Sequence, residues 1–306
     1  MRTSLILIPI LLALLVNHFC VIDPIVVEIP TIPVNPKQIT YEHVGHGLPA
    51  PEDLAIDGDG FGYIGLGDGR IARMKIGTKD VMFKNFTRTG EALATCGQRD
   101  MEETCGRPLG MLFVSASPFL QYFDSKVQVF PKNQILLVAD AYKGLLAVDA
   151  VGVIVPLVNE VNGVPLIFSN SLAQSPKTGD IYMTHSSDKF ARNRVVTEVF
   201  EGRARGSIYV FNPTTNSTTI LLENIPFPNG IAFSDDANTL YLAQTSRWKV
   251  VKIDLLTMKE STMASLPGYP DNILLTYFPP LNQQVLLVGI GSQTDPNVIT
   301  SYSIHI

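Results

Sequence analysis

The sequence predicts an all-β protein, and two patterns favour that class. Beyond residue 50, short runs rich in Ile, Val, Leu, Phe and Tyr alternate with clusters of Gly, Pro, Asp and Asn, and long amphipathic helical windows are scarce. With 306 residues, of which 46 % are apolar and 17 % charged, the chain can bury a sizeable core. The net charge is −5 and no Lys/Arg run occurs, so nucleic acid is not an expected partner.

A repeated unit predicts the architecture. Five stretches each combine a polar turn, a short apolar strand, a Gly/Asp/Asn hairpin and a second apolar strand. Their equivalent residues, which we call the axial positions, follow one another at intervals of 42 to 61 residues: Glu52, Leu109, Asn170, Asn229 and Asp271. Such periods suit the blades of a β-propeller. A β-sandwich, the alternative, would not explain why the same turn recurs before the same strand.

Oxygen-bearing side chains stand at most of the axial positions. Because the first strand of each propeller blade lines the central channel, these side chains are expected to converge on the axis. Two carboxylates and three amides, without thiol or imidazole, would form an oxygen cage suited to Ca²⁺. The alternative is a shared turn type, although Gly or Ser would serve a turn equally well. The predicted ligands are Glu52, Asn170, Asn229, Asp271 and Asn272.

The first 27 residues predict entry into the secretory pathway. One early Arg precedes an apolar stretch at residues 5–16, which suits the core of a signal peptide. Extending the stretch reaches membrane length only by accepting three polar residues. A cleaved signal peptide and a type II signal-anchor therefore both remain open, so the protein is expected to be secreted or to lie in the ER or cell-surface membrane. Residues 28–47 would be a linker and residues 48–306 the propeller.

Two further features suit an oxidising compartment. Cys96 and Cys105 flank the polar loop GQRDMEET, the kind of short loop that a disulfide closes. Zinc is the alternative, but two thiols without a nearby His make a poor zinc site. N-glycosylation sequons begin at Asn85 and Asn216.

Between about Pro51 and Gly289 the chain carries the motifs CGRPLG, ADAYKGL, and FPNG with PDNI. Together they resemble the strictosidine synthase-like family, most closely the adipocyte plasma membrane-associated proteins. The resemblance implies a six-bladed propeller of the superfamily that includes the paraoxonases, a membrane anchor, and a disulfide between the two loop cysteines. Residues 114–134 stand where relatives have a short hairpin. The family pattern is lost after about residue 289, which predicts an incomplete last blade through an early C-terminus.

The resemblance also implies roles for individual residues. The ligands of the paraoxonase catalytic calcium fall on the same five residues that the repeat predicts. Asp53 matches a ligand of the second paraoxonase calcium, but its partner position here is Ser171. The paraoxonase catalytic histidine corresponds to Leu109, which cannot accept a proton. The strictosidine synthase catalytic glutamate lies in a C-terminal strand pair that this chain lacks, so strictosidine synthesis is not expected.

Two functions follow as hypotheses. The first is a calcium-dependent hydrolase of small aryl-type esters, in which the metal would polarise the ester carbonyl. His185 is the weak candidate for a general base, because histidine titrates in the useful range, although a lone strand His is more often structural. Ser186 and Ser187 lack the GxSxG elbow of a nucleophile. The alternative is a non-catalytic luminal or cell-surface propeller that calcium stabilises and that binds a protein or a lipid-like ligand.

Overall fold

The computed structural model describes residues 48–76, 83–124, 126–279, 282–291 and 300–305. All of these residues belong to the compact unit that spans residues 33–306. The predicted signal or anchor segment and the predicted linker lie outside the described residues. Within the described part of the chain, no helix is long and apolar enough to cross a membrane.

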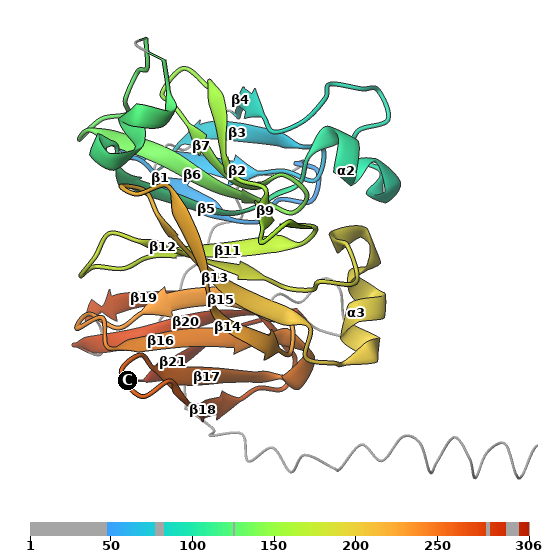
Figure 1. The fold of residues 1–306 in the computed structure, drawn as a ribbon, viewed down its shortest axis with the longest axis vertical. Helices are drawn as coiled ribbons and strands as arrows, with labels where there is room; N and C mark the ends of the chain where they lie inside the picture. The colour runs from blue at the N-terminus through green and yellow to red at the C-terminus, as the bar shows by residue number, and fades with distance from the viewer. Residues whose placement is uncertain (1–47, 77–82, 125, 280–281, 292–299, 306) are drawn as a thin grey trace, which may run out of the picture. The chain divides into compact units, whose positions relative to one another are not determined.

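Five antiparallel sheets of the blade type follow one another along the chain, which confirms the all-β propeller fold (Figure 1). Blade 1 contains β1 (Leu54–Ile56), β2 (Phe61–Gly65), β3 (Arg70–Lys75) and β4 (Lys84–Arg88). Blade 2 contains β5 (Pro108–Ser115), β6 (Gln134–Asp140), β7 (Gly144–Val148) and β8 (Ile154–Val158). Blade 3 contains β11 (Ser169–Gln174), β12 (Ile181–His185), β13 (Gly206–Asn212) and β14 (Ser217–Ile225).

The remaining elements complete the described fold. Blade 4 contains β15 (Pro228–Phe233), β16 (Thr239–Gln244), β17 (Lys249–Asp254) and β18 (Lys259–Ser265), and blade 5 contains β19 (Tyr269–Phe278), β20 (Gln283–Gly291) and β21 (Thr300–His305). A small hairpin joins β9 (Glu160–Val161) to β10 (Val164–Pro165). The helices are η2 (Arg99–Met101), α2 (Glu102–Cys105), η3 (Ser117–Tyr122), η4 (Arg192–Arg194), α3 (Val195–Glu201) and η5 (Thr245–Arg247). The described residues thus form five of the six blades that the resemblance implies.

The first strand of each blade is its inner strand, and neighbouring inner strands pack together in the order β1, β5, β11, β15, β19. Two motif glycines allow this close approach. A Cβ added at Gly110 would lie 2.6 Å from the Asn170 carbonyl oxygen, and one at Gly230 would lie 2.4 Å from the Ile273 nitrogen. Both contacts are with backbone, so a larger residue would push the inner strands apart. The Gly of RPLG and of FPNG is therefore explained by packing.

The core lies between successive blades. Strand β6 illustrates the reason for its composition, because every residue after Gln134 is buried. A strand covered on both faces has no polar side, so residues 135–139 form a continuous apolar run, which ends at the hydrogen-bonded Asp140. The 114–134 segment also enters this core: Phe119 is fully buried and Phe130 nearly so. The Tyr122 hydroxyl donates to the Pro213 carbonyl oxygen of blade 3 (2.7 Å), so the segment is a packed part of blade 2.

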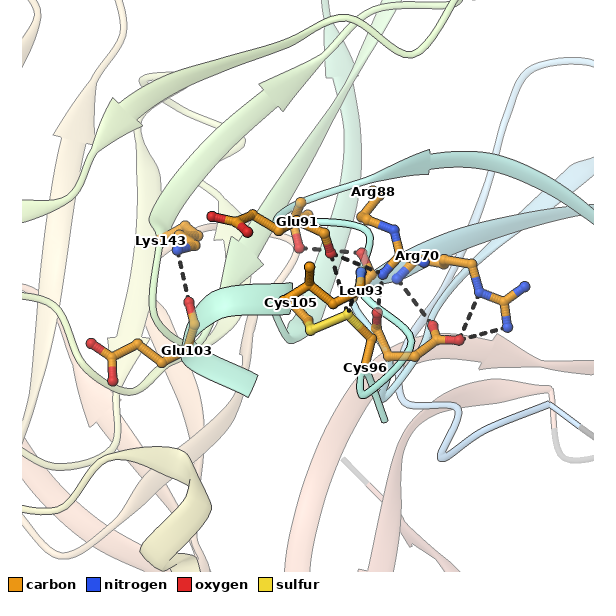
Figure 2. Close-up of a disulfide and its surroundings, with 11 residues drawn as sticks. Arg70, Arg88, Glu91, Leu93, Cys96, Glu103, Cys105 and Lys143 are labelled. Carbon is orange, nitrogen blue, oxygen red and sulfur yellow. Dashed lines mark hydrogen bonds and ion pairs between the residues drawn. A yellow bond between two sulfur atoms is a disulfide. The ribbon is translucent and has the colours of Figure 1, made fainter. Parts of the chain in front are cut away.

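Cys96 and Cys105 form the predicted disulfide (Figure 2). Cys105 is buried at the end of α2, whereas most of the loop before α2 is exposed. The Lys143 ammonium donates to the Glu103 carbonyl oxygen (2.8 Å), which ties the loop to the β6–β7 turn (Figure 2). The disulfide and this bond attach α2 to the loop before it and to the β6–β7 turn.

Candidate functional site

A cavity of about 580 Å³, which we call the axial cavity, opens at one end of the inner strands. All five axial positions line it: Glu52, Leu109, Asn170, Asn229 and Asp271. The convergence predicted from the sequence repeat is therefore observed. Four of the five predicted calcium ligands meet here, each from a different blade.

A β-bulge at the start of the inner strands explains how these side chains reach the cavity. The pairing between inner strand and second strand shifts register between Pro108 and Gly110 in blade 2 and between Pro270 and Ile273 in blade 5. The same shift occurs in blades 3 and 4 at the equivalent place. Because a bulge releases residues from the regular ladder, it re-aims their side chains. The axial positions of blades 2 to 5 lie within these bulges, whereas Glu52 of blade 1 lies just before the regularly paired β1.

The fifth predicted ligand lies elsewhere. Asn272 lines a second cavity of about 860 Å³, together with Asp53 and Ser171. These three residues each follow an axial position in the sequence. Adjacent residues of one bulge thus face different cavities, and Asp53 shares the second cavity with Asn272.

Two half-buried carboxylates, Glu52 and Asp271, give the axial cavity its electrostatic character. Burial raises the pKa of Glu52 to about 7, with a further rise from the nearby charge of Asp271. Burial also raises the pKa of Asp271, while a hydrogen bond from Asn229 and the charge of Arg192 lower it. Two carboxylates that are costly to ionise together would be stabilised by a bound cation.

Arg107 is the main partner of Glu52. Its Nη2 lies 2.9 Å from Glu52 Oε2, and its Nη1 donates to the Ala50 carbonyl oxygen at 2.9 Å. The Arg107 backbone nitrogen donates to Asp140 Oδ2 (2.7 Å). The side chain is almost completely buried, so this guanidinium fixes the position of Glu52. The Arg of the CGRPLG motif therefore supports the site without lining the cavity.

Two asparagine side chains are oriented by the same arrangement in successive blades. Asn170 Nδ2 donates to Ser186 Oγ (2.9 Å), which donates to the Pro228 carbonyl oxygen of the next blade (2.8 Å). Asn229 Nδ2 donates to Thr245 Oγ1 (3.1 Å), which donates to the Pro270 carbonyl oxygen (2.7 Å). Because each hydroxyl group donates its hydrogen to a carbonyl oxygen, it can only act as an acceptor toward the asparagine amide nitrogen.

This arrangement turns the amide oxygens away from the hydroxyl groups. Asn229 Oδ1 is buried and has no hydrogen-bond partner among the described residues. A buried unpaired carbonyl oxygen is costly, and a cation would satisfy it. Within the described residues, no group of three or more His, Cys, Asp or Glu could hold a metal. A metal here would therefore need the amide oxygens as well as the two carboxylates, and this all-oxygen set fits calcium.

A second ion pair borders the cavity and was not anticipated from the sequence. Arg192 lines the axial cavity, and its Nη1 donates to Glu102 Oε1 at 2.9 Å. Glu102 Oε2 accepts from the Tyr142 hydroxyl (3.1 Å), which in turn accepts from the Asn193 nitrogen (2.8 Å). Glu102 is the first residue of α2 and lies inside the loop that the Cys96–Cys105 disulfide closes. The signal available in the sequence was the Tyr of ADAYKGL, whose role is to hold Glu102.

His185 lies outside the residues that line the axial cavity. Its side chain is buried, and its Nε2 accepts a hydrogen bond from the Ile167 nitrogen (3.1 Å). Burial lowers its pKa to about 4, so the ring is neutral near neutral pH. Ser187 donates to the buried Glu198 of α3 (2.5 Å) instead of facing the cavity. These contacts suit packing within blade 3.

The opposite wall of the axial cavity is apolar. Phe168 and Phe227 are buried with ring centroids 5.5 Å apart, and they cluster with Leu109. Val195 and Val199 of α3 pack against this cluster. The cavity therefore combines oxygen donors on one side with a hydrophobic surface on the other, as small-molecule sites commonly do.

Comparisons with known sequences identify relatives. Residues 170–256 match the family model for strictosidine synthase, and residues 40–74 match the N-terminal model for strictosidine synthase-like proteins. Protein strictosidine synthase-like 10 of Arabidopsis thaliana is 32 % identical over 235 residues, covering 74 % of this chain and 58 % of the relative. The adipocyte plasma membrane-associated protein of Danio rerio is 32 % identical over 239 residues, covering 74 % and 51 %. The chain thus spans about half the length of the curated relatives it matches.

Solved structures agree with the propeller fold. A gluconolactonase from Xanthomonas campestris superimposes with a TM-score of 0.56 at 16 % identity, covering 84 % of this chain and 77 % of that protein. Regucalcin from Agrobacterium tumefaciens, a calcium-binding protein, superimposes with a TM-score of 0.51 at 18 % identity, covering 84 % and 75 %. At such identities the likeness concerns the fold alone.

Proposed function

We propose that this chain, which belongs to the strictosidine synthase-like family, is a calcium-binding propeller that hydrolyses small aryl-type esters in its axial cavity. The observation that supports this most is the meeting of Glu52, Asn170, Asn229 and Asp271 in one cavity. The unpaired, buried Asn229 Oδ1 adds a reason for a cation to bind there.

In this proposal the four residues hold Ca²⁺, which would polarise an ester carbonyl and stabilise negative charge on its oxygen. Arg107 keeps Glu52 in place, and Ser186 and Thr245 orient the two amides. The aromatic wall binds the apolar part of the ester and excludes water from it. Overall, water adds to the carbonyl carbon, the bond to the alcohol oxygen breaks, and the alcohol leaves with a proton.

The test combines metal binding with turnover. Calcium binding by isothermal titration calorimetry and phenyl acetate hydrolysis are measured for the purified chain with and without a chelator. We expect Asn229→Ala to weaken calcium binding at least about tenfold and to reduce hydrolysis with it. Asn159→Ala, at an exposed position outside the cavity, is the matched control. Hydrolysis that survives chelation would contradict the proposal.

A second function is favoured by one observation. Blade 2 places Leu109 at its axial position, and the described residues lining the cavity include no His. A non-catalytic propeller that binds a protein or lipid-like ligand would need no base. Tight calcium binding with phenyl acetate hydrolysis no faster than buffer would support this alternative and exclude the esterase.

We also propose that the protein enters the secretory pathway. The Cys96–Cys105 disulfide supports this, because such bonds persist in oxidising compartments. The relative from Danio rerio is named for a plasma membrane association. Whether residues 1–27 are cleaved or anchor the chain can be tested by N-terminal sequencing of protein from secretory cells. A mature protein that retains residue 1 and stays in the membrane fraction would support the anchor.

A further inference from the structure

The axial cavity contains a cation that the proposed calcium cage does not use. Arg192 of η4 lines the cavity, with 19 % of its side chain exposed. A guanidinium has five N–H donors, and Nη1 uses one of them on Glu102. Among the described residues no other hydrogen-bond partner of Arg192 is found. The remaining donors are available to a ligand in the cavity.

The position of Arg192 is fixed from the side that faces away from the cavity. Glu102 is buried, and its second oxygen accepts from the Tyr142 hydroxyl. Arg107 Nε lies 4.0 Å from Glu102 Oε1, so two guanidinium groups share one carboxylate. The positive charge of Arg192 is therefore only partly compensated by its own partner. Figure 1 shows α2, which carries Glu102, at the same end of the strands as α3.

An uncovered apolar surface lies beside this cation. Helix α3 follows η4 directly, and Val195 and Val199 pack inward on the aromatic cluster. Phe200 also lines the cavity, yet it is 80 % exposed, and Val196 is 51 % exposed. Apolar side chains that are left exposed beside a pocket indicate a surface that a ligand covers.

We propose that the axial cavity binds a carboxylic acid with an apolar aryl or alkyl body. The carboxylate pairs with the planar fork of Arg192, and the body lies against Phe200, Phe168 and Phe227. A carboxylate matches the guanidinium fork in shape. One guanidinium close to two carboxylates favours a singly charged head over a dianion. The inference rests on the proposed function, in which such an acid is the product of ester hydrolysis.

The neighbouring acids set a condition for this binding. Glu52 is paired with Arg107, but Asp271 has no such ion pair among the described residues. Bound calcium would neutralise these carboxylates. The affinity for the acid is therefore expected to be higher with calcium than with a chelator, and this difference is measured alongside the variants.

The test measures binding, independently of turnover. Benzoate and octanoate are titrated into the full chain by isothermal titration calorimetry in a buffer that contains calcium. Benzyl alcohol and octanol serve as the neutral probes. Arg192→Met should weaken binding of both acids roughly tenfold or more and leave the alcohols unchanged. Arg192→Lys, which keeps the charge but loses the fork, should lie between. Arg194→Met, at an exposed neighbouring position, is the matched control.

A second variant tests the contact between the apolar body of the ligand and Phe200, whose side chain is exposed. Phe200→Ser should weaken octanoate and octanol alike. Equal wild-type affinity for acid and alcohol, or unchanged acid affinity in both Arg192 variants, would overturn the carboxylate assignment. Acid binding without any ester hydrolysis would keep this inference and remove the esterase. Ester hydrolysis together with an acid affinity that does not depend on Arg192 would overturn this inference and keep the esterase.

Discussion

The two cavities on the inner strands differ in how their oxygen atoms are used. In the second cavity, Asp53 accepts hydrogen bonds from the Leu54 and Met111 nitrogens, both at 2.8 Å, one on each oxygen. In the axial cavity, Asn229 Oδ1 has no partner among the described residues. An oxygen already satisfied by backbone closes a turn or joins two blades, whereas an unpaired buried oxygen needs a ligand. An oxygen-bearing side chain therefore indicates a ligand site only when the structure shows that its oxygen has no hydrogen-bond partner within the protein.

The surroundings of the two cavities differ as well. Most residues that line the second cavity are apolar and come from all five inner strands. The axial cavity is lined by partly buried charges of both signs, Glu52 and Arg192, and Glu52 is paired with the buried Arg107 behind it. The same strands thus present a charged end and an apolar side. The bulges separate the two, because consecutive residues there point in different directions.

The largest expected effect comes from removing the buried cation of the charged end. Arg107→Met leaves Glu52 without its ion-pair partner and the Ala50 carbonyl without its donor. Breaking a buried ion pair on one side costs about 3–5 kcal/mol. Urea denaturation should show a loss of this size in the free energy of unfolding. Arg194→Met should stay within about 0.5 kcal/mol of wild type, and an equally small loss in Arg107→Met would contradict the assigned role.

The next largest effect tests whether His185 belongs to the core and not to the charged end. Its pKa in the folded chain is about 4, below the usual 6.5, so the unfolded chain takes up the proton first as pH falls. The stabilisation is present above pH 6.5 and is lost as pH falls through 4, by about 3 kcal/mol in all. His185→Gln should flatten this part of the pH profile of the unfolding free energy. A profile identical to that of wild type would show that His185 does not titrate as described.

Calcium should discriminate between the two cavities. At a free concentration of about 100 times Kd, a ligand that binds only the folded state adds about 2.7 kcal/mol to the free energy of unfolding. We expect that gain in wild type and in Ser171→Ala of the second cavity, and its reduction to about 1.4 kcal/mol or less in Asn229→Ala, whose Kd is at least about tenfold higher. The measurement is urea denaturation with calcium and with chelator. The opposite pattern would place the metal in the second cavity.

The smallest effect concerns the outer strands, which lie at the opposite edge of each blade from the inner strands that line the two cavities. Asn216 is exposed at the β13–β14 turn, whereas Asn85 lies in β4 and its Oδ1 accepts from Arg70 Nη1 (2.6 Å). We expect a glycan at Asn216 in preference to Asn85, read as a glycosidase-sensitive mobility shift that Asn216→Gln removes. Asn216→Gln should change the unfolding free energy by no more than about 0.5 kcal/mol.

Much of the fold follows from the sequence alone. The alternation of short apolar runs with turn residues is local, so it reports strands without any knowledge of their partners. The repeat then relates Glu52, Leu109, Asn170, Asn229 and Asp271, and the structure brings those residues into one cavity. The Cys96–Cys105 pair could be predicted because both residues flank one short loop.

Contacts between blades could not be predicted, because they depend on the tertiary structure. Asn272 follows Asp271 directly, but the bulge of β19 turns it to the other cavity. Arg192 and Glu102 lie 90 residues apart and meet only through the disulfide-closed loop and η4. The sequence determines which residue types stand at the start of each inner strand. The packing of blades decides which of their oxygens stay unpaired, because hydrogen bonds from distant backbone satisfy some and leave others free.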